Sequence, residues 1–420
     1  MKLLVFAHVP PPFHGQSYGV QLMLNGFGGD HRNPKRVAAA PNDYGIECYH
    51  VNARLSKKLE DIGEFQGGKI FLILFHCLQA IWCRFRYGVT NFYYVPAPGK
   101  SVALYRDWLI MFICRPFYKK VILHWHAAGM ARWLETVASI RIRSFTFRML
   151  KYADLSIALS EFNRRDAEKL FAQRIAVVNV GVPDPCPHFE AEVLPHRRAR
   201  IDARKQLLAG KPAGPGNDAS IVNVLYLAHC TRDKGLFDTV EGVALANEKL
   251  AVENSSLRLR LTLVGAFISR AEEKELHEFV QKLRLQHIVE CLGFVSTERK
   301  AQALHDADLF CFPTFYTAEN QPGNLIEAMA FGLSIVTTRW RSLPEMLPKD
   351  YPGLVDPGSP PQIADALLQL VVSDLAEPLR EMFVRRFTLE RHLAGMAEAL
   401  HSVESADPKV VLNPVLSSLN

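Results

Sequence analysis

The chain has 420 residues and a mass of 47.3 kDa, about three times the size of a typical domain, which excludes a single small module. Hydrophobic residues make up 49 % and charged residues 22 %, a composition that excludes global disorder. The net charge of +6 is unevenly distributed, with 30 basic and 17 acidic residues in 1–220 against 19 basic and 26 acidic residues in 221–420. The two parts are therefore expected to face different partners.

The basic part suits an anionic membrane surface or a phosphorylated substrate. No nucleic-acid partner is expected, because neither an aromatic, glycine-rich RNA motif nor a zinc-finger spacing accompanies the charge. Eight cysteines form no Cys-x-x-Cys pair, and several stand in apolar runs, which indicates buried free thiols in a reducing compartment. We therefore expect a cytoplasmic protein, with peripheral attachment to the inner face of the cytoplasmic membrane left open.

The N-terminal part predicts a parallel sheet, because short apolar runs alternate with longer amphipathic ones in a βαβ pattern. The expected strands lie at 2–8, 91–95, 121–126, 154–159 and 175–180, and the expected helices include 68–86, 101–117 and 161–171. This pattern predicts an N-terminal Rossmann-like domain over 1–190.

The longest apolar run, from Ile70 to Trp82, is interrupted by His76 and Gln79. It falls short of the roughly 20 residues that cross a bilayer, so no membrane-spanning segment is expected. The helix around it, 68–87, can pack against the core of the first sheet, which we favour, or lie in a membrane interface.

A Pro- and Gly-rich, basic stretch interrupts the pattern, and we place a linker over 191–220. A second alternation then predicts another Rossmann-like domain over 221–386. Its expected strands lie near 222–228, 258–264, 308–312 and 334–338, and its expected helices near 235–250, 270–286, 298–306, 323–331 and 361–373. A final amphipathic helix and tail, 387–420, are expected to pack back toward the N-terminal domain. The fold class is thus α/β with two doubly wound parallel sheets, whose ligands bind at the carboxyl ends of the strands in the cleft between the domains.

The most informative segment is 313–330, Pro-Thr-Phe-Tyr-Thr-Ala-Glu-Asn-Gln-Pro-Gly-Asn-Leu-Ile-Glu-Ala-Met-Ala. It follows an apolar strand and contains a helix start near Gly323, so Glu319 lies in the loop and Glu327 in the helix. The free amides of a helix N-terminus bind phosphate, and the two carboxylates can accept hydrogen bonds from sugar hydroxyls. The arrangement suits a sugar joined to a nucleoside diphosphate. The alternative is that Glu327 only complements the helix dipole and that Glu319 is a solvated loop residue.

The Glu-x7-Glu spacing, set within Glu-x-x-Pro-x-x-Leu-Ile-Glu-Ala-Met-Ala-x-Gly, resembles the signature of retaining glycosyltransferases of family 4, among the group 1 glycosyl transferases of bacterial polysaccharide synthesis. Further segments resemble the same family in the expected order: 11–17, 124–126, 178–182, 226–235, 263–265, 343–345 and 353–356. The resemblance implies the GT-B fold, with the acceptor bound by the first Rossmann-like domain and the nucleotide-sugar donor by the second.

The resemblance also implies roles for individual residues. Three are expected to be catalytic: Glu319 near the hydroxyls of the donor sugar, Lys234 at the departing diphosphate and His126 beside the reacting sugar. Glu327 is expected to hold the ribose. The other donor-binding positions are Gly15, Gln16, His229, Arg232, Gly265, Gly323, Asn324 and Leu325.

Two of these positions depart from the family pattern. His229 stands where an arginine is common, and Gln16 stands where many members have a second glycine. As an imidazole, His229 could still donate to a phosphate. Neither departure affects the pair of glutamates.

Metal binding is not expected at these positions. His124 shares a strand face with His126 through the period-two alternation, but no third ligand accompanies the pair. Asp306 and Asp308 match the Asp-x-Asp motif of the other glycosyltransferase fold, yet they precede their strand, which places them at the wrong edge of the sheet. We therefore expect no divalent ion and no cofactor besides the nucleotide-sugar co-substrate.

The expected function is that of a retaining, metal-independent hexosyltransferase. It would move a sugar from a UDP- or GDP-sugar to a saccharide or polyprenyl-diphosphate-linked acceptor in cell-surface polysaccharide synthesis. A non-hydrolysing nucleotide-sugar epimerase of the same architecture and a catalytically silent scaffold protein stay open as alternatives. The joint presence of Glu319, Lys234 and Glu327 argues against the scaffold.

Overall fold

The computed structural model describes residues 1–12, 14–33, 43–55, 68–211 and 219–404. The chain divides into two compact units, the first formed by Met1–Val182 with Thr388–Asn420 and the second by Pro183–Phe387. The first unit thus ends before the expected boundary at 190. The tail beyond residue 404 lies outside the described residues.

The first unit contains a six-stranded parallel sheet in the order β2-β1-β3-β4-β5-β6. Its strands are β1 (Lys2–Ala7), β2 (Glu47–Asn52), β3 (Asn91–Tyr94), β4 (Lys120–Trp125), β5 (Leu155–Ala158) and β6 (Ile175–Val177). Most strand residues are buried, as is typical of a parallel sheet covered by helices on both faces. Strand β2 was not expected, because polar residues interrupt its apolar pattern.

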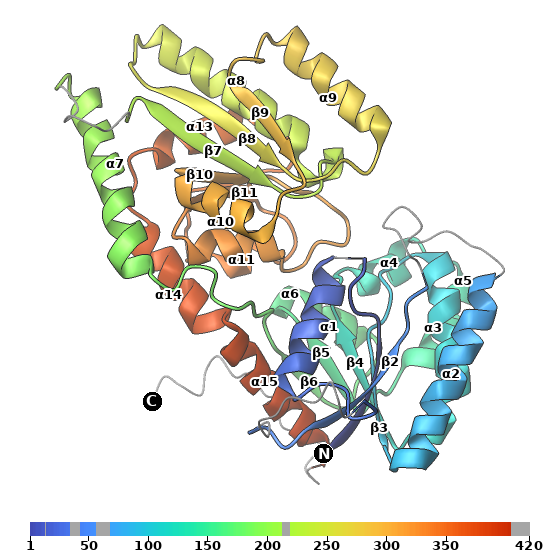
Figure 1. Ribbon diagram of the computed structural model, residues 1–420. Helices are drawn as coiled ribbons and strands as arrows, with labels where there is room; N and C mark the ends of the chain where they lie inside the picture. Colours follow the sequence, from blue (N-terminus) through green and yellow to red (C-terminus); the bar gives the residue numbers. More distant parts are fainter. Residues whose placement is uncertain (13, 34–42, 56–67, 212–218, 405–420) are drawn as a thin grey trace. The chain divides into compact units, whose positions relative to one another are not determined.

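Helices cover both faces of this sheet (Figure 1). α1 (Gly15–Gly26) and α15 (Leu389–His401) pack on one face, where Met396 and Leu400 share a core with Val20 and Met23. The opposite face carries α2 (Gly68–Tyr87), α3 (Ser101–Cys114), α4 (Met130–Thr136), α5 (Ile140–Leu150) and α6 (Glu161–Lys169). The C-terminal helix is therefore part of the first unit.

Helix α2 is longer than the apolar run that the sequence showed. The helix continues through the polar His76, whose side chain is buried. By length and composition, the 19 residues Lys69–Tyr87 are apolar enough to cross a membrane. One face of α2 packs into the core through Ile73, Cys77 and Cys83, whereas much of its other face is exposed.

The second unit contains another six-stranded parallel sheet, in the order β12-β11-β10-β7-β8-β9. Its strands are β7 (Ile221–Leu227), β8 (Arg258–Val264), β9 (Val289–Gly293), β10 (Leu309–Phe312), β11 (Ser334–Thr338) and β12 (Leu354–Val355). The helices that flank it are α8 (Leu236–Val252), α9 (Arg270–Lys282), α10 (Thr297–Asp306), α11 (Gly323–Ala330), α12 (Leu343–Met346), α13 (Pro360–Leu370) and α14 (Ala376–Arg386). The two sheets confirm the predicted fold class.

Helix α7 (Leu194–Leu208) occupies much of the segment 191–220 that was expected to be a linker. Its basic side chains are structural parts of the second unit. The Arg197 guanidinium donates to three backbone carbonyls of that unit, and Arg200 and Arg204 pair with the buried Asp308. Asp308 therefore lies at the amino end of β10 and holds α7. The remaining Pro- and Gly-rich part of the expected linker, 212–218, lies outside the described residues.

All eight cysteines are free, and only Cys291 is exposed. The prediction of unpaired thiols is thus confirmed, and seven of the eight are buried as expected. Burial raises the pKa of Cys311 to about 12, so this thiol is inert near neutral pH.

The strand orders locate the crevice where each sheet can bind a ligand. In the first sheet the direction of winding reverses between β1 and β3, and in the second it reverses between β7 and β10. Loops that leave such a pair of strands diverge to opposite faces and leave an opening at the carboxyl edge. The loops that follow β7 and β10 contain Lys234 and Glu319.

Candidate active site

Two loops meet at the carboxyl edge of the second sheet. The amide of Phe315 donates to the carbonyl of Asp233 at 2.9 Å, and Thr314 Oγ1 lies 3.3 Å from the same carbonyl oxygen. Gly235 has a φ of +77°, and a Cβ there would lie 2.3 Å from the carbonyl oxygen of Pro313. A side chain at 235 would therefore push the two loops apart, which explains the glycine that follows Lys234.

Lys234 and Glu319 form an ion pair in this opening. The Lys234 Nζ lies 2.6 Å from Glu319 Oε2, and their side chains are 17 % and 9 % exposed. The Thr314 hydroxyl donates to the same carboxylate oxygen at 3.1 Å. The Lys234 ammonium also lies 4.4 Å from the centre of the Tyr316 ring. These contacts hold a cation and a carboxylate side by side at the strand ends.

The amino end of α11 lies in the same loop region. The Asn324 side chain donates to the carbonyl of Leu227 at 2.5 Å, and its oxygen accepts from the Leu325 amide at 2.8 Å. Asn324 thus fastens α11 to the end of β7, and the Leu325 amide already has a partner. A Cβ at Gly323 would meet no atom within 4 Å, so the approach to the first amides of the helix is open.

Glu327 is held by a residue that the sequence did not single out. Lys300 on α10 places its Nζ 2.5 Å from Glu327 Oε1, with the two side chains 32 % and 18 % exposed. The pair joins residues 27 positions apart in the sequence, and no local spacing predicts it. Each of the two signature glutamates is therefore paired with a lysine.

Three other expected donor residues, Gly265, His229 and Arg232, follow the strands β8 and β7. Gly265 has a φ of +152°, and a Cβ there would lie 1.7 Å from the Ala228 carbonyl oxygen, so the end of β8 approaches the loop after β7 directly. Burial lowers the pKa of His229, and the charge of Lys234 lowers it further. His229 is therefore a neutral imidazole near neutral pH and can donate one hydrogen bond and accept another.

Arg232, the third of these residues, contacts α9 and α8. Its guanidinium lies 2.5 Å from Glu275 Oε1 on α9 and 4.0 Å from the centre of the Phe237 ring. Half of the side chain is exposed. Its role at the donor site stays a prediction.

Gly15, Gln16 and His126 belong to the first unit. His126 follows β4, and its ring centre lies 4.3 Å from that of His124, as the alternation predicted. Burial lowers the pKa of His126 to about 3, with further contributions from His392, His14 and His8. His126 is therefore neutral and suited to hydrogen bonding. Across the described ranges, no group of three or more His, Cys, Asp or Glu side chains is arranged to hold a metal ion.

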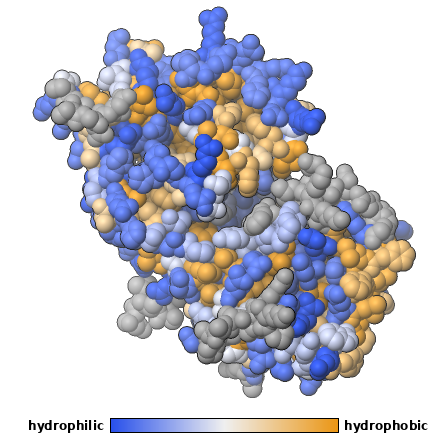
Figure 2. Space-filling model, viewed as in Figure 1, coloured by the Kyte–Doolittle hydropathy of each residue, from blue (hydrophilic) through white to orange (hydrophobic). Residues whose placement is uncertain are grey.

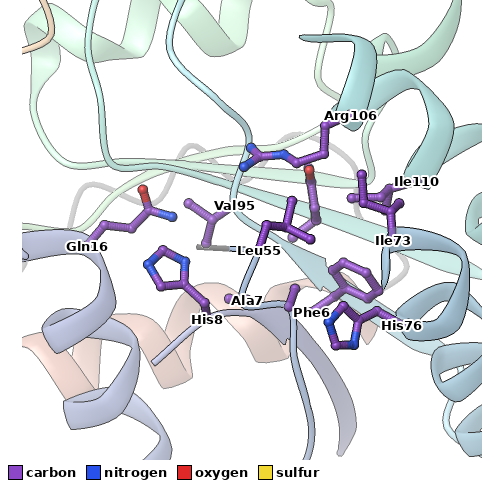
Figure 3. A pocket seen from close by; sticks show the side chains of 12 residues that line it. Phe6, Ala7, His8, Gln16, Leu55, Ile73, His76, Val95, Arg106 and Ile110 are labelled. Carbon is purple, nitrogen blue, oxygen red and sulfur yellow. The ribbon is translucent and has the colours of Figure 1, made fainter. Parts of the chain in front are cut away.

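A pocket opens at the carboxyl edge of the first sheet, between β1 and β3 (Figure 3). It is narrow, and its polar lining residues include His8, Gln16 and Arg106. The Arg106 guanidinium is fixed by Asp107, whose buried carboxylate also accepts from the Tyr94 hydroxyl at 2.6 Å. This pocket lies at the reversal point of the sheet and presents one cation.

Comparisons with known proteins agree with these observations. Residues 222–373 match the family model described as Glycosyl transferases group 1. WcaL of Escherichia coli K12, named for glycosyltransferase function in colanic acid biosynthesis, is 28 % identical over 196 residues, which cover 43 % of this chain and 46 % of that protein. The amylovoran biosynthesis glycosyltransferase AmsK of Erwinia amylovora is 25 % identical over 60 % of this chain and 61 % of its own length. The aligned part thus spans about half to three fifths of these relatives.

Solved structures show the fold. HepE from Anabaena, in complex with UDP, superimposes with a TM-score of 0.60 at 16 % identity and covers 96 % of this chain and 100 % of that one. Sucrose-phosphate synthase from Thermosynechococcus elongatus has a TM-score of 0.64 at 17 % identity, over 97 % of this chain and 100 % of that one. Residues 222–373 are thus similar to the group 1 glycosyl transferases, and the chain has the GT-B fold of these solved structures.

Proposed function

We propose that this protein is a retaining, metal-independent hexosyltransferase that uses a nucleotide sugar, of UDP or GDP, to extend a cell-surface polysaccharide or its lipid-linked precursor. The observation that carries the proposal is the pair of Lys234 Nζ and Glu319 Oε2, 2.6 Å apart, in the loops that adjoin the open amino end of α11. The names of the bacterial relatives, which refer to colanic acid and amylovoran biosynthesis, support a polysaccharide product. The UDP bound in a neighbour of the same fold supports a nucleotide-sugar donor, and the retaining stereochemistry rests on the resemblance to family 4.

The residues of the second unit would act on the donor. In the transfer, the bond from the anomeric carbon to the diphosphate oxygen breaks, and a bond from that carbon to the acceptor hydroxyl oxygen forms. The acceptor proton is released to the departing phosphate or to solvent. Lys234 and the first amides of α11 would stabilise the negative charge on the diphosphate, since preorganised donors stabilise developing charge most strongly. Glu319 would accept hydrogen bonds from the sugar, and Glu327 from the ribose.

The pocket of the first unit would receive the acceptor. Arg106 offers a fixed cation for a phosphate or carboxylate group, and the apolar side chains around it suit the face of a sugar ring or the start of a lipid chain. The neutral His126 would orient a hydroxyl or a backbone group near the reacting sugar. Gln16, which lines the same pocket, would take part in either the donor or the acceptor side of the site.

The proposal is tested by incubating the protein with UDP-, GDP- and ADP-sugars in EDTA and measuring thermal stabilisation and sugar release by mass spectrometry. One nucleotide sugar is expected to stabilise the wild type and to be hydrolysed slowly, and Lys234→Ala and Glu319→Gln are expected to abolish the release. Lys249→Ala, which removes an exposed ion pair with Asp365 near the far end of α8, is the matched control. The proposal is contradicted if no donor stabilises the protein and no sugar is released. It is also contradicted if an epimer is released without transfer of the sugar to any acceptor.

A further inference from the structure

Helix α2 presents a stripe of large apolar side chains to the outside of the first unit. We call Phe71, Leu74, Phe75, Leu78, Trp82 and Phe85 the α2 stripe. Their spacing of three or four residues places them on one face of the helix. Phe71 is 77 % exposed, Leu78 65 % and Phe85 71 %. Figure 2 shows orange residues gathered at the edge of the first unit where Figure 1 draws α2.

The stripe is not needed to hold α2 in place. Ile73, Cys77 and Cys83, on the opposite face, are fully or almost fully buried in the core. A helix that is apolar on all sides is usually buried on all sides, and in α2 the second apolar face lacks such burial. Exposed apolar surfaces of this extent on soluble units mark sites of interaction.

The apolar surface continues beyond α2. The ring of Phe85 packs edge-on against that of Phe117, with 6.2 Å between centroids, and Phe112 on α3 is 70 % exposed. The carboxyl ends of α2, α3 and α5 add cations. Arg84 and Arg86 lie in the last turn of α2, while Arg148 and Lys151 line a groove beside Phe112.

We propose that the α2 stripe and these cations form a docking surface for an anionic lipid bilayer, with α2 lying in the membrane interface. Aromatic and aliphatic side chains enter the boundary between headgroups and acyl chains, and arginine and lysine at the border bind anionic headgroups. A membrane-spanning α2 is disfavoured, because it would pull Ile73, Cys77 and Cys83 out of the core. The cations at the border favour a partner with negative charge, whereas a second copy of the chain would present the same cations.

The inference does not depend on the proposed function, and its test requires no substrate. The full chain is sedimented with vesicles of phosphatidylcholine alone or with phosphatidylglycerol, at low and high salt. Binding is expected to be at least about tenfold stronger to the anionic vesicles and to weaken with salt. The variant Phe75→Ser/Leu78→Ser/Phe85→Ser is expected to lose about tenfold or more of the binding. Phe294→Ser, which changes a side chain 81 % exposed in the second unit, is expected to bind as the wild type does.

A second pair of variants tests the charges. Arg86→Glu/Arg148→Glu is expected to remove the preference for anionic vesicles, whereas Arg385→Glu, at a residue 61 % exposed on α14, leaves it intact. Thermal melts confirm that each variant folds. The proposal is overturned if the wild type ignores anionic vesicles, if the triple variant binds them as well as Phe294→Ser, or if light scattering shows a lipid-free dimer that only the triple variant dissociates. Resistance of the bound protein to extraction at alkaline pH would overturn it in favour of a spanning helix.

Discussion

Replacement of Lys234 by alanine separates the structural and the chemical role of the site. The lysine Nζ lies 2.6 Å from Glu319 Oε2, and both side chains are largely buried. Loss of the cation leaves the carboxylate in a poorly solvated position, where the Thr314 hydroxyl still donates to it. Breaking a buried pair costs about 3 to 5 kcal/mol, and the residual exposure places this pair at the lower end, about 3 kcal/mol of unfolding free energy.

The expected effect of Lys234→Ala on turnover has a different origin from its effect on stability. If Lys234 stabilises the charge on the departing diphosphate, its removal deletes one preorganised donor from the transition state. Such a deletion costs about 10²- to 10³-fold in kcat. Folding and turnover are distinguished by measuring kcat below the melting temperature of each variant and the unfolding free energy by chemical denaturation.

The double variant Lys234→Ala/Glu319→Gln sharpens this test. A glutamine carries no charge and can donate to neighbouring carbonyls, so the double variant is expected to recover most of the lost unfolding free energy while kcat stays low. Lys249→Ala removes a pair whose side chains are 43 % and 67 % exposed, and it is expected to cost less than about 1 kcal/mol and to leave kcat unchanged. Turnover of Lys234→Ala within about threefold of wild type would refute the role assigned to this lysine.

Three further predictions follow from the second unit. Lys300→Ala is expected to raise the KM for the donor about tenfold, the equivalent of 1.4 kcal/mol, with little change in kcat, because Glu327 loses the partner that holds it; an unchanged KM in steady-state kinetics contradicts this. Gly293→Ala is expected to lower the unfolding free energy by roughly 1 to 2 kcal/mol, because Gly293 has a positive φ. Gly265→Ala is expected to lower it by well over that amount, because a Cβ at 265 would also meet a backbone carbonyl. Equal losses of the two variants in urea denaturation would refute the clash. Burial raises the pKa of Asp308, but its hydrogen bonds and ion pairs with two arginines outweigh burial and lower the pKa below 3.8. Its contribution to stability is therefore present above pH 3.8 and is lost as the pH falls further. Asp308→Asn is expected to flatten the plot of unfolding free energy against pH in that range, and parallel plots for the two proteins would contradict this.

The parts of the fold that sequence patterns could predict are those with local signals. The apolar run before Pro313, the glycine at 323 and the glutamates eight residues apart define a strand, a loop and a helix within 25 residues of sequence. The structure forms these elements where they were expected. The prediction that a ligand binds at the carboxyl edge of each sheet followed from the parallel arrangement of the strands alone.

Other features depend on contacts between distant residues, which no local pattern carries. Arg197 and Arg200 resemble a solvated charge run in a linker, and only their contacts with carbonyls and with Asp308, more than 100 positions away, make α7 a structural helix. Lys300 was not noticed for the same reason, because its partner Glu327 is on another helix. The contacts of Arg232 with Glu275 and Phe237 likewise join it to α9 and to α8, and no local pattern predicts them.

The exposed face of α2 shows a different limit. A stretch of apolar residues predicts a helix and predicts that one side is buried, but periodicity alone does not tell whether a second apolar side meets protein, lipid or water. The structure buries Ile73 and Cys77 and leaves Phe71 and Phe85 outside. These exposed side chains support a position of α2 in a membrane interface, which composition alone could not do.

The most direct test of the donor site is the affinity of the nucleoside diphosphate by calorimetry, in EDTA, for the wild type and for Glu327→Ala. The account predicts that UDP or GDP binds the wild type without a divalent ion and that the variant binds it at least about tenfold more weakly. Equal affinity of the two proteins, or binding by the wild type only when magnesium is added, would contradict the assignment of a metal-independent donor site to the loops after β7 and β10.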